Sequence, residues 1–211
     1  MSLIDLIEDT SHKENITGVV IGIVTNNKDP DDLGRVKVKF PWLSDSDESN
    51  WARIVSPMAG KERGIYFLPE VDDEVLVAFE FGDINMPYVI GSLWKGKDKP
   101  PQTNSDGKNN MRIIKSRSGH LIKLDDTDGA EKIEIIDSSE KNKIVIDAKN
   151  EKISIISSKD ISISAPNGKV TIEANDIEAK SNASTKIEAS AGMDLKASGN
   201  MNVKGATVNL N

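Results

Sequence analysis

The sequence contains no cysteine and only two histidines, His12 and His120. Disulfides and thiol chemistry are therefore excluded, and a zinc site built from the usual thiolate and imidazole ligands is not expected. Aromatic residues make up 4% of the chain, and all of them lie between Phe40 and Trp94. Conventional core material is thus confined to the first half of the chain.

Long hydrophobic runs are missing as well. No window of about 18 apolar residues exists, so no membrane-spanning helix is expected. Residues 1–15 include Leu3, Ile4, Leu6 and Ile7 but lack the basic region and the small-residue cleavage site of a secretion signal. We expect a protein made in the cytoplasm, with residues 1–15 as an N-terminal arm. A frayed terminus that packs locally is the simpler alternative for this segment.

An excess of positive charge is also absent, since the formal net charge is −7. Residues 1–100 hold 11 basic and 18 acidic residues, whereas residues 101–211 hold 16 of each. The first half would repel a phosphate backbone and the second offers it no net attraction. Nucleic acid is therefore not expected as a partner.

The first half is rich in strand signals separated by turn signals. The segment 35–40, RVKVKF, alternates strictly between apolar and polar residues, as a half-buried strand does. The strand candidates are 16–25, 35–40, 51–56, 74–81 and 88–93. Five short strands over this length predict a small closed barrel of the OB-fold type at 16–94. The polar, proline-containing segment 95–110 predicts a linker that is too short for an inserted catalytic domain.

The second half carries a short repeat of apolar or small residues in i, i+2 pairs. The pairs are Ile133/Ile135, Ile144/Ile146, Ile153/Ile155, Ile161/Ile163, Val170/Ile172, Ile177/Ala179, Thr185/Ile187, Met193/Leu195, Met201/Val203 and Val208/Leu210. From Ile144 to Val208 the spacing averages eight residues, and Thr185 fits the register least well. Each pair describes a short strand with one apolar face.

A single copy of this repeat lacks the apolar surface to fold alone. Two aliphatic side chains contribute about 1.5–3 kcal/mol each when buried, whereas ordering eight residues costs roughly 1–2 kcal/mol per residue. Three chains wound into a triangular prism would bury the apolar pair members of all three as a common trimer core. Burial between chains would then offset the entropy lost on ordering. Each backbone would then bond to strands of the next chain. The predicted fold is all-β, an OB-fold barrel followed by a trimeric intertwined β-helix at 111–211.

Two other interpretations of the repeat stay open. A disordered tail is disfavoured because the segment is charge-balanced and periodic. A monomeric β-solenoid remains a rival, although its coils typically need more than one inward pair and larger side chains.

No enzyme or metal motif is complete. Ser118 and His120 lie close together in SRSGH but lack the strand–turn–helix context of a nucleophile elbow. The acidic segments 29–34 and 125–129 lack the full spacing and the terminal Glu of a calcium loop. We expect no enzymatic activity, no cofactor and no metal.

Four stretches carry a resemblance to a known family. They are 29–43 (DPDDLGRVKVKFPWL), 51–60 (WARIVSPMAG), 69–94 and 114–137. They resemble the central spike protein of contractile injection machines, a family that includes phage baseplate assembly protein V, phage tail spikes and the VgrG spike of type VI secretion. The resemblance implies an OB-fold and a trimeric β-helix that form a rigid spike at the baseplate centre. Such a spike pierces the target envelope mechanically and carries a tip protein. It does not tell whether the machine is a phage tail, a tailocin, an extracellular injection system or type VI-like.

The sequence departs from parts of this family. Type VI spikes carry a hub module before the OB-fold, so we expect a separate hub protein at the OB end here. Some phage spikes end in an iron-binding His-x-His tip, but no histidine follows His120. We therefore expect a PAAR-type tip protein on Val203, Val208, Leu210 and Asn211. The alternative function is a trimeric OB-fold binding module with the β-helix as a spacer.

Overall fold

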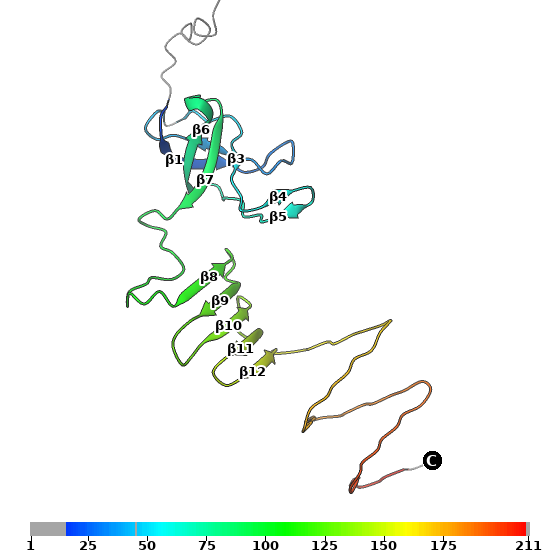
Figure 1. Ribbon diagram of the computed structural model, residues 1–211. Coiled ribbons are helices and arrows are strands. Elements are labelled where there is room, and N and C mark those ends of the chain that lie inside the picture. Colours follow the sequence, from blue (N-terminus) through cyan, green and yellow to red (C-terminus); the bar gives the residue numbers. More distant parts are fainter. Residues whose placement is uncertain (1–15, 45, 210–211) are drawn as a thin grey trace, which may run out of the picture. The chain divides into compact units, whose positions relative to one another are not determined.

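A computed structural model of the chain describes residues 16–44 and 46–209. The chain divides into two compact units, Met1–Lys159 and Asp160–Asn211. Among the described residues the regular structure is β-strand, apart from one 3₁₀ turn at Glu80–Gly82 (Figure 1). The predicted all-β class is confirmed. The proposed arm, residues 1–15, and the tip residues Leu210 and Asn211 lie outside the described residues.

The first sheet is built from the five strand candidates of the first half. Its strands are β1 (Val19–Asn26), β2 (Lys37–Lys39), β3 (Arg53–Ile54), β6 (Glu74–Phe79) and β7 (Pro87–Leu93). Their order is β2-β1-β6-β7-β3, and every pairing is antiparallel except that of β3 with β7. Just before the two edge strands, Val36 and Ala52 exchange backbone hydrogen bonds of 3.1 and 2.7 Å. The sheet therefore curls toward closure, as an OB domain does.

The core of this sheet follows from the alternation in its strands. In β6, EVLVAF, every second side chain is buried and its neighbours are half-buried. The buried set is Val24, Val36, Val38, Phe40, Ala52, Val75, Val77, Phe79 and Val89. Gly22 faces this core, and a Cβ there would lie 3.3–3.4 Å from Val77, Phe40 and Val38. Glycine thus allows β1 to approach the other strands closely.

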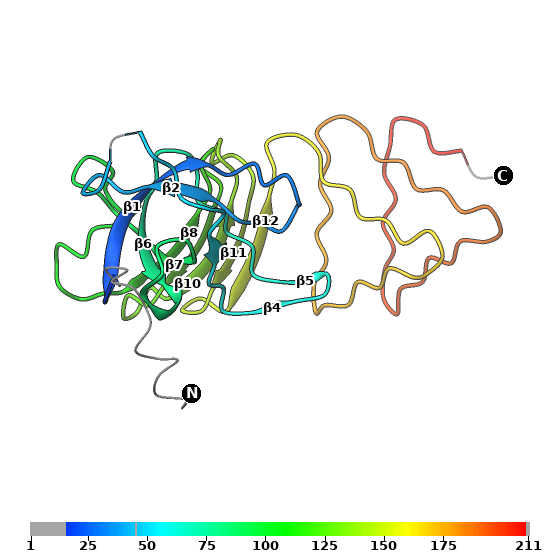
Figure 2. The same cartoon turned by 90° about the horizontal axis from the view of Figure 1, so that it is seen from above.

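A second sheet is an antiparallel meander of five strands. It comprises β8 (Met111–Lys115), β9 (Leu121–Asp125), β10 (Lys132–Ile136), β11 (Lys143–Asp147) and β12 (Lys152–Ile156). Each strand pairs with its neighbour in sequence, so the strands lie side by side in chain order (Figures 1 and 2).

The hydrogen-bond partners of the first repeats differ from the sequence-based expectation. We predicted that repeat strands bond to a neighbouring chain, yet β10, β11 and β12, which carry the first three pairs, bond to one another. The physical reason lies in the short polar turns between them. At 137–142 the Asp137 carboxylate accepts hydrogen bonds from Ser139 and Asn142, which lowers its pKa to about 2. Such turns close hairpins within one chain.

After β12 the strand pairing stops in the part of the chain that the structure describes. Residues 157–209 run as extended segments joined by bends, although the apolar pairs continue through them. The second unit, Asp160–Asn211, consists entirely of such segments in its described part.

Candidate assembly surfaces

One face of the β8–β12 sheet consists of two apolar rows that cross all or most of its strands. The strand register places Ile114, Ile122, Ile135, Ile144 and Ile155 in the first row. The second row contains Leu124, Ile133, Ile146 and Ile153. All nine side chains are between 40 and 69% exposed. We call this surface the repeat face.

The opposite face of the same sheet mixes charged residues with apolar ones such as Ile113, Leu121, Ile136, Val145 and Ile156. Lys123 and Glu134 form a cross-strand ion pair of 2.5 Å at its centre. Toward one edge, Asp125, Lys132, Asp147 and Lys152 alternate in charge along consecutive strands. Opposite charges across strands stabilise a solvated face. The charged residues of this face are thus paired within the chain, whereas the repeat face presents exposed apolar side chains.

The structure brings the first predicted core residues together on one surface. The three pairs from Ile133 to Ile155 lie on the repeat face. Ile114, Ile122 and Leu124 share that face but were missed by the sequence analysis, because the turn at 116–120 interrupts the spacing.

The predicted core residues beyond residue 160 are not brought together, and within the single chain they are exposed rather than buried. Those that the structure describes are Ile161, Ile163, Val170, Ile172, Ile177, Ile187, Met193, Leu195, Met201, Val203 and Val208. The most exposed are Ile163 at 75%, Ile172 at 73%, Leu195 at 72% and Ile187 at 70%. The physical reason is that the described segments after β12 form no sheet, so no neighbouring strand of the same chain covers these side chains. This exposure includes Val203 and Val208 at the predicted tip site.

A groove on the OB domain was not foreseen from the sequence. It lies between residues 27–34 and residues 54–68 and has a volume of about 900 Å³. Its second wall includes a small hairpin formed by β4 (Ala59–Gly60) and β5 (Arg63–Gly64). We call this feature the hairpin groove. The hairpin escaped notice because its strands are two residues long and show no alternation.

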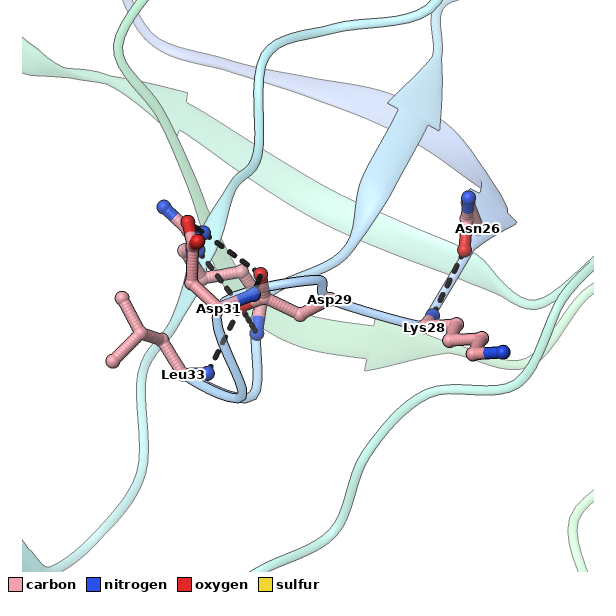
Figure 3. A network of polar contacts seen from close by, with 6 residues as sticks. Asn26, Lys28, Asp29, Asp31 and Leu33 are labelled. Atoms are coloured by element: carbon pink, nitrogen blue, oxygen red, sulfur yellow. Dashed lines mark hydrogen bonds and ion pairs between the residues drawn. The ribbon is translucent and has the colours of Figure 1, made fainter.

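The first wall of the hairpin groove is fixed by a polar network around Asp29 (Figure 3). The buried Asp29 carboxylate accepts hydrogen bonds from the backbone N–H groups of Asp31, Leu33 and Arg35. It also accepts two from the Arg35 guanidinium, at 2.8 and 2.7 Å. The Arg35 side chain and these N–H groups hold the pKa of Asp29 well below its usual range. The acidic segment 29–34 is thus a structural turn that folds onto its own arginine.

The region around His120 is organised as a turn. The Ser116 side chain accepts a 3.0 Å hydrogen bond from the backbone N–H of His120. The Nδ1 atom of His120 accepts a 3.2 Å hydrogen bond from the backbone N–H of Ser138. The nearby Ser118 hydroxyl lies 3.3 Å from that of Ser116. Within residues 16–44 and 46–209, no group of three or more acidic or imidazole side chains is placed to hold a metal ion.

Comparison with known proteins finds relatives for part of the chain. Residues 20–94 match the type VI secretion system and phage-baseplate injector OB domain. The chain is also 32% identical over 106 residues to the type VI secretion system spike protein VgrG2a of Pseudomonas aeruginosa. Over these residues the chain is similar to the VgrG and baseplate spike proteins. The match covers 46% of this chain and 12% of VgrG2a.

Other spike proteins show the same limited overlap. VgrG1b of P. aeruginosa is 31% identical over 137 residues, which is 60% of this chain and 18% of VgrG1b. VgrG3 of Vibrio cholerae is 37% identical over 82 residues, which is 37% of this chain and 8% of VgrG3. The chain thus spans less than a fifth of the length of these three relatives. No helix among the described residues is long and apolar enough to cross a membrane.

Proposed function

We propose that the chain is the central spike of a contractile injection machine. In this role it is a homotrimer at the centre of the baseplate that pierces the target envelope mechanically and carries a tip protein. Similarity to these spike proteins supports a structural role of the spike type. The trimer itself is supported by the repeat face.

The repeat face is the main support for this proposal, because its exposed apolar rows are expected to be buried against another chain. Its nine aliphatic side chains are roughly half exposed, so covering each one would contribute about 1 kcal/mol. Contiguous apolar surface of this kind marks an association site. The apolar band is only two residues wide on each strand, and β10 is flanked by the acidic residues Glu131 and Asp137. Three such narrow faces close a triangular prism with an aliphatic axis.

The same logic extends to the region after β12. There the apolar pairs recur every eight residues on average, with the side chains exposed. In the trimer these pairs face the common axis, and each extended segment bonds to the segments of the other two chains. An intertwined β-helix over the C-terminal part of residues 111–211 results. The meander of β8 to β12, whose strands pair within one chain, precedes this intertwined part in the spike.

The two ends of the trimer have different partners. At one end the OB domain contacts the baseplate through a separate hub protein, and at the other a PAAR-type tip protein docks on Val203, Val208, Leu210 and Asn211. The spike acts on the target membrane only by mechanical force. The chain needs no nucleic acid, cofactor or metal for this role.

The proposed role is structural, with no enzymatic step. The Nδ1 atom of His120 already accepts a backbone hydrogen bond, so the SRSGH turn has a structural explanation. The test is an assay of the purified trimer for peptidoglycan hydrolase, nuclease and esterase activity. Turnover that disappears with Ser118→Ala or His120→Ala would refute the structural assignment.

The mass of the purified chain in solution tests the trimer directly. Light scattering should give three times the chain mass of 23.0 kDa, and a monomer mass contradicts the proposal. The alternative function, a trimeric binding module with a stalk, predicts the same mass. Electron microscopy separates the two, because a spike labelled on its OB domain should appear at the centre of a sheathed particle's baseplate.

A further inference from the structure

One end of the OB domain exposes large apolar side chains from two segments. The first segment, 40–50, follows β2, and the second, 80–86, is the turn between β6 and β7. We call these two segments together the OB pole. Their exposed apolar residues are Trp42 at 53%, Leu43 at 53%, Phe81 at 93% and Met86 at 49%. Tryptophan, phenylalanine and methionine are enriched in the cores of protein interfaces, so this composition indicates a protein partner.

The two segments of the OB pole are fixed to each other and to the core. The side-chain amide of Asn50 donates a 3.0 Å hydrogen bond to the carbonyl oxygen of Asn85. The ring centroid of Phe40 lies 6.2 Å from that of Trp42 and 5.4 Å from that of Phe79, a core residue. A surface ordered in this way binds a partner with little loss of conformational entropy.

The backbone at Phe81 supports a binding role for the OB pole. This residue has φ 51° and ψ 22°, a left-handed conformation that is unusual for a bulky side chain. Its side chain is 93% exposed, so burial within the chain does not offset the strain. Strained backbone positions concentrate at binding and active sites. A partner that covers the Phe81 ring would supply the missing burial.

The charge of the OB pole indicates the chemistry of that partner. The segments 40–50 and 80–86 contain five acidic residues and no basic one. On the adjoining strands β2 and β3, Lys37, Lys39 and Arg53 add three positive charges, which leaves an excess of two negative charges.

The start of the chain adds further negative charge at this end. The backbone N–H of Ile16 donates a 3.0 Å hydrogen bond to the carbonyl oxygen of Gly82 in the OB pole. Residues 1–15, which precede Ile16, contain four acidic residues and one lysine. Nucleic acid, anionic lipid and a second copy of this chain, with its net charge of −7, would therefore be repelled, whereas a basic protein surface would be attracted.

We propose that the OB pole docks on a protein surface with an apolar centre and a rim of lysine or arginine. The inference rests on the proposed function, in which the OB domain contacts a separate hub protein, and it specifies the surface used and the chemistry of the hub. Strand β7 begins at the pole with Pro87 and ends at Leu93, before the linker 95–110. The pole is thus the end of the domain from which the linker does not leave.

A photo-crosslinker tests this contact in assembled particles. We would replace Phe81 with benzoylphenylalanine in the full-length chain, isolate the sheathed particles that contain it, irradiate them and identify the adduct by mass spectrometry. Because Phe81 is 93% exposed, the trimer mass and melting temperature should not change. The same replacement of Trp42 repeats the test on the other segment of the pole.

The matched control carries the crosslinker at Tyr66, which is 74% exposed and lines the hairpin groove. Positions 42 and 81 should give an adduct with the same other baseplate protein, and position 66 should not. Particles that contain the spike overturn the pole assignment if they give no adduct at 42 and 81, adducts only with another copy of this chain, or the same adduct at 66. The spike proposal would stand in each case. If the native chain is absent from sheathed particles, both proposals fall.

The charge argument gives the experiment a second arm. Asp47 is exposed on the OB pole. In the Phe81 crosslinker background, Asp47→Lys should lower the adduct yield severalfold. Asp106→Lys makes the same change of charge in the linker and should not lower it. Equal yields from the two variants overturn the basic rim of the partner.

Discussion

Replacing Ile155 by aspartate should affect the proposed trimer and the isolated chain differently. In the isolated chain Ile155 is 61% exposed, so a charge there should do little harm. In the proposed trimer the same side chain faces the axis. Covering its exposed part contributes roughly 1–2 kcal/mol per copy, or about 3–6 kcal/mol per trimer.

Aspartate would remove that contribution and add a larger penalty. Each unpaired buried charge costs about 3–5 kcal/mol, and three carboxylates would meet at one axis. The loss therefore exceeds about 10 kcal/mol per trimer, which is comparable with the whole stability of a typical folded protein. We expect Ile155→Asp to prevent trimer formation at micromolar concentration, as measured by light scattering and thermal unfolding.

The neighbouring residue provides the control. Ser154 lies on the opposite face of β12, where its register partner is Val145. Ser154→Asp should change stability by only about 0.5 kcal/mol. If both variants retain the trimer mass and the same melting temperature, the repeat face does not line a trimer axis and the reasoning fails.

Three further predictions concern other parts of the chain. Gly22→Val should destabilise the OB domain by about 1–3 kcal/mol through overpacking, whereas Gly91→Val, where a Cβ meets nothing within 4 Å, should not lower the melting temperature. Because the folded-state pKa of Asp29 is lowered, its contribution to stability is present above the unfolded pKa of about 4 and is lost as the pH falls toward the folded value. Asp29→Asn should remove that acid-dependent loss from the pH profile of unfolding, and Asp32→Asn should preserve it. Deleting residues 203–211 should abolish pull-down of the tip protein while light scattering still shows a trimer, and undiminished binding would place the docking surface elsewhere.

The strands of the OB domain could be predicted because their alternation reflects a real difference between two environments. In 35–40 the apolar positions are the ones that the structure buries. In 74–81 it buries Val75, Val77 and Phe79, whereas Phe81 is 93% exposed. The hairpin of β4 and β5 gave no such signal, since its apolar neighbours Tyr66 and Phe67 are exposed. A periodic sequence pattern arises where one face of a strand is buried within the chain. A groove that is lined by exposed apolar residues therefore produces no such pattern.

The second sheet shows a different limit of sequence reasoning. The i, i+2 pairs correctly identified which side chains share a face, for example Ile144 and Ile146. They could not identify the hydrogen-bond partner of each strand, because an antiparallel meander and an intertwined helix impose the same period of two. The deciding information lies in turns such as 137–142, whose polar side chains close a hairpin.

The two sheets differ in what stabilises them, and this difference bears on the proposed mechanical role. The OB sheet encloses nine buried apolar residues of its own, so it can fold before assembly. The β8–β12 sheet has its apolar rows exposed, and those rows run across the strands in the same direction as the hydrogen bonds between strands. If the rows line the trimer axis, the interstrand hydrogen bonds lie along that axis too. Axial load would then press successive strands together, and sideways opening would require separating three apolar faces at once. The repeat face, which is exposed in the single chain, would therefore make the assembled spike stiff.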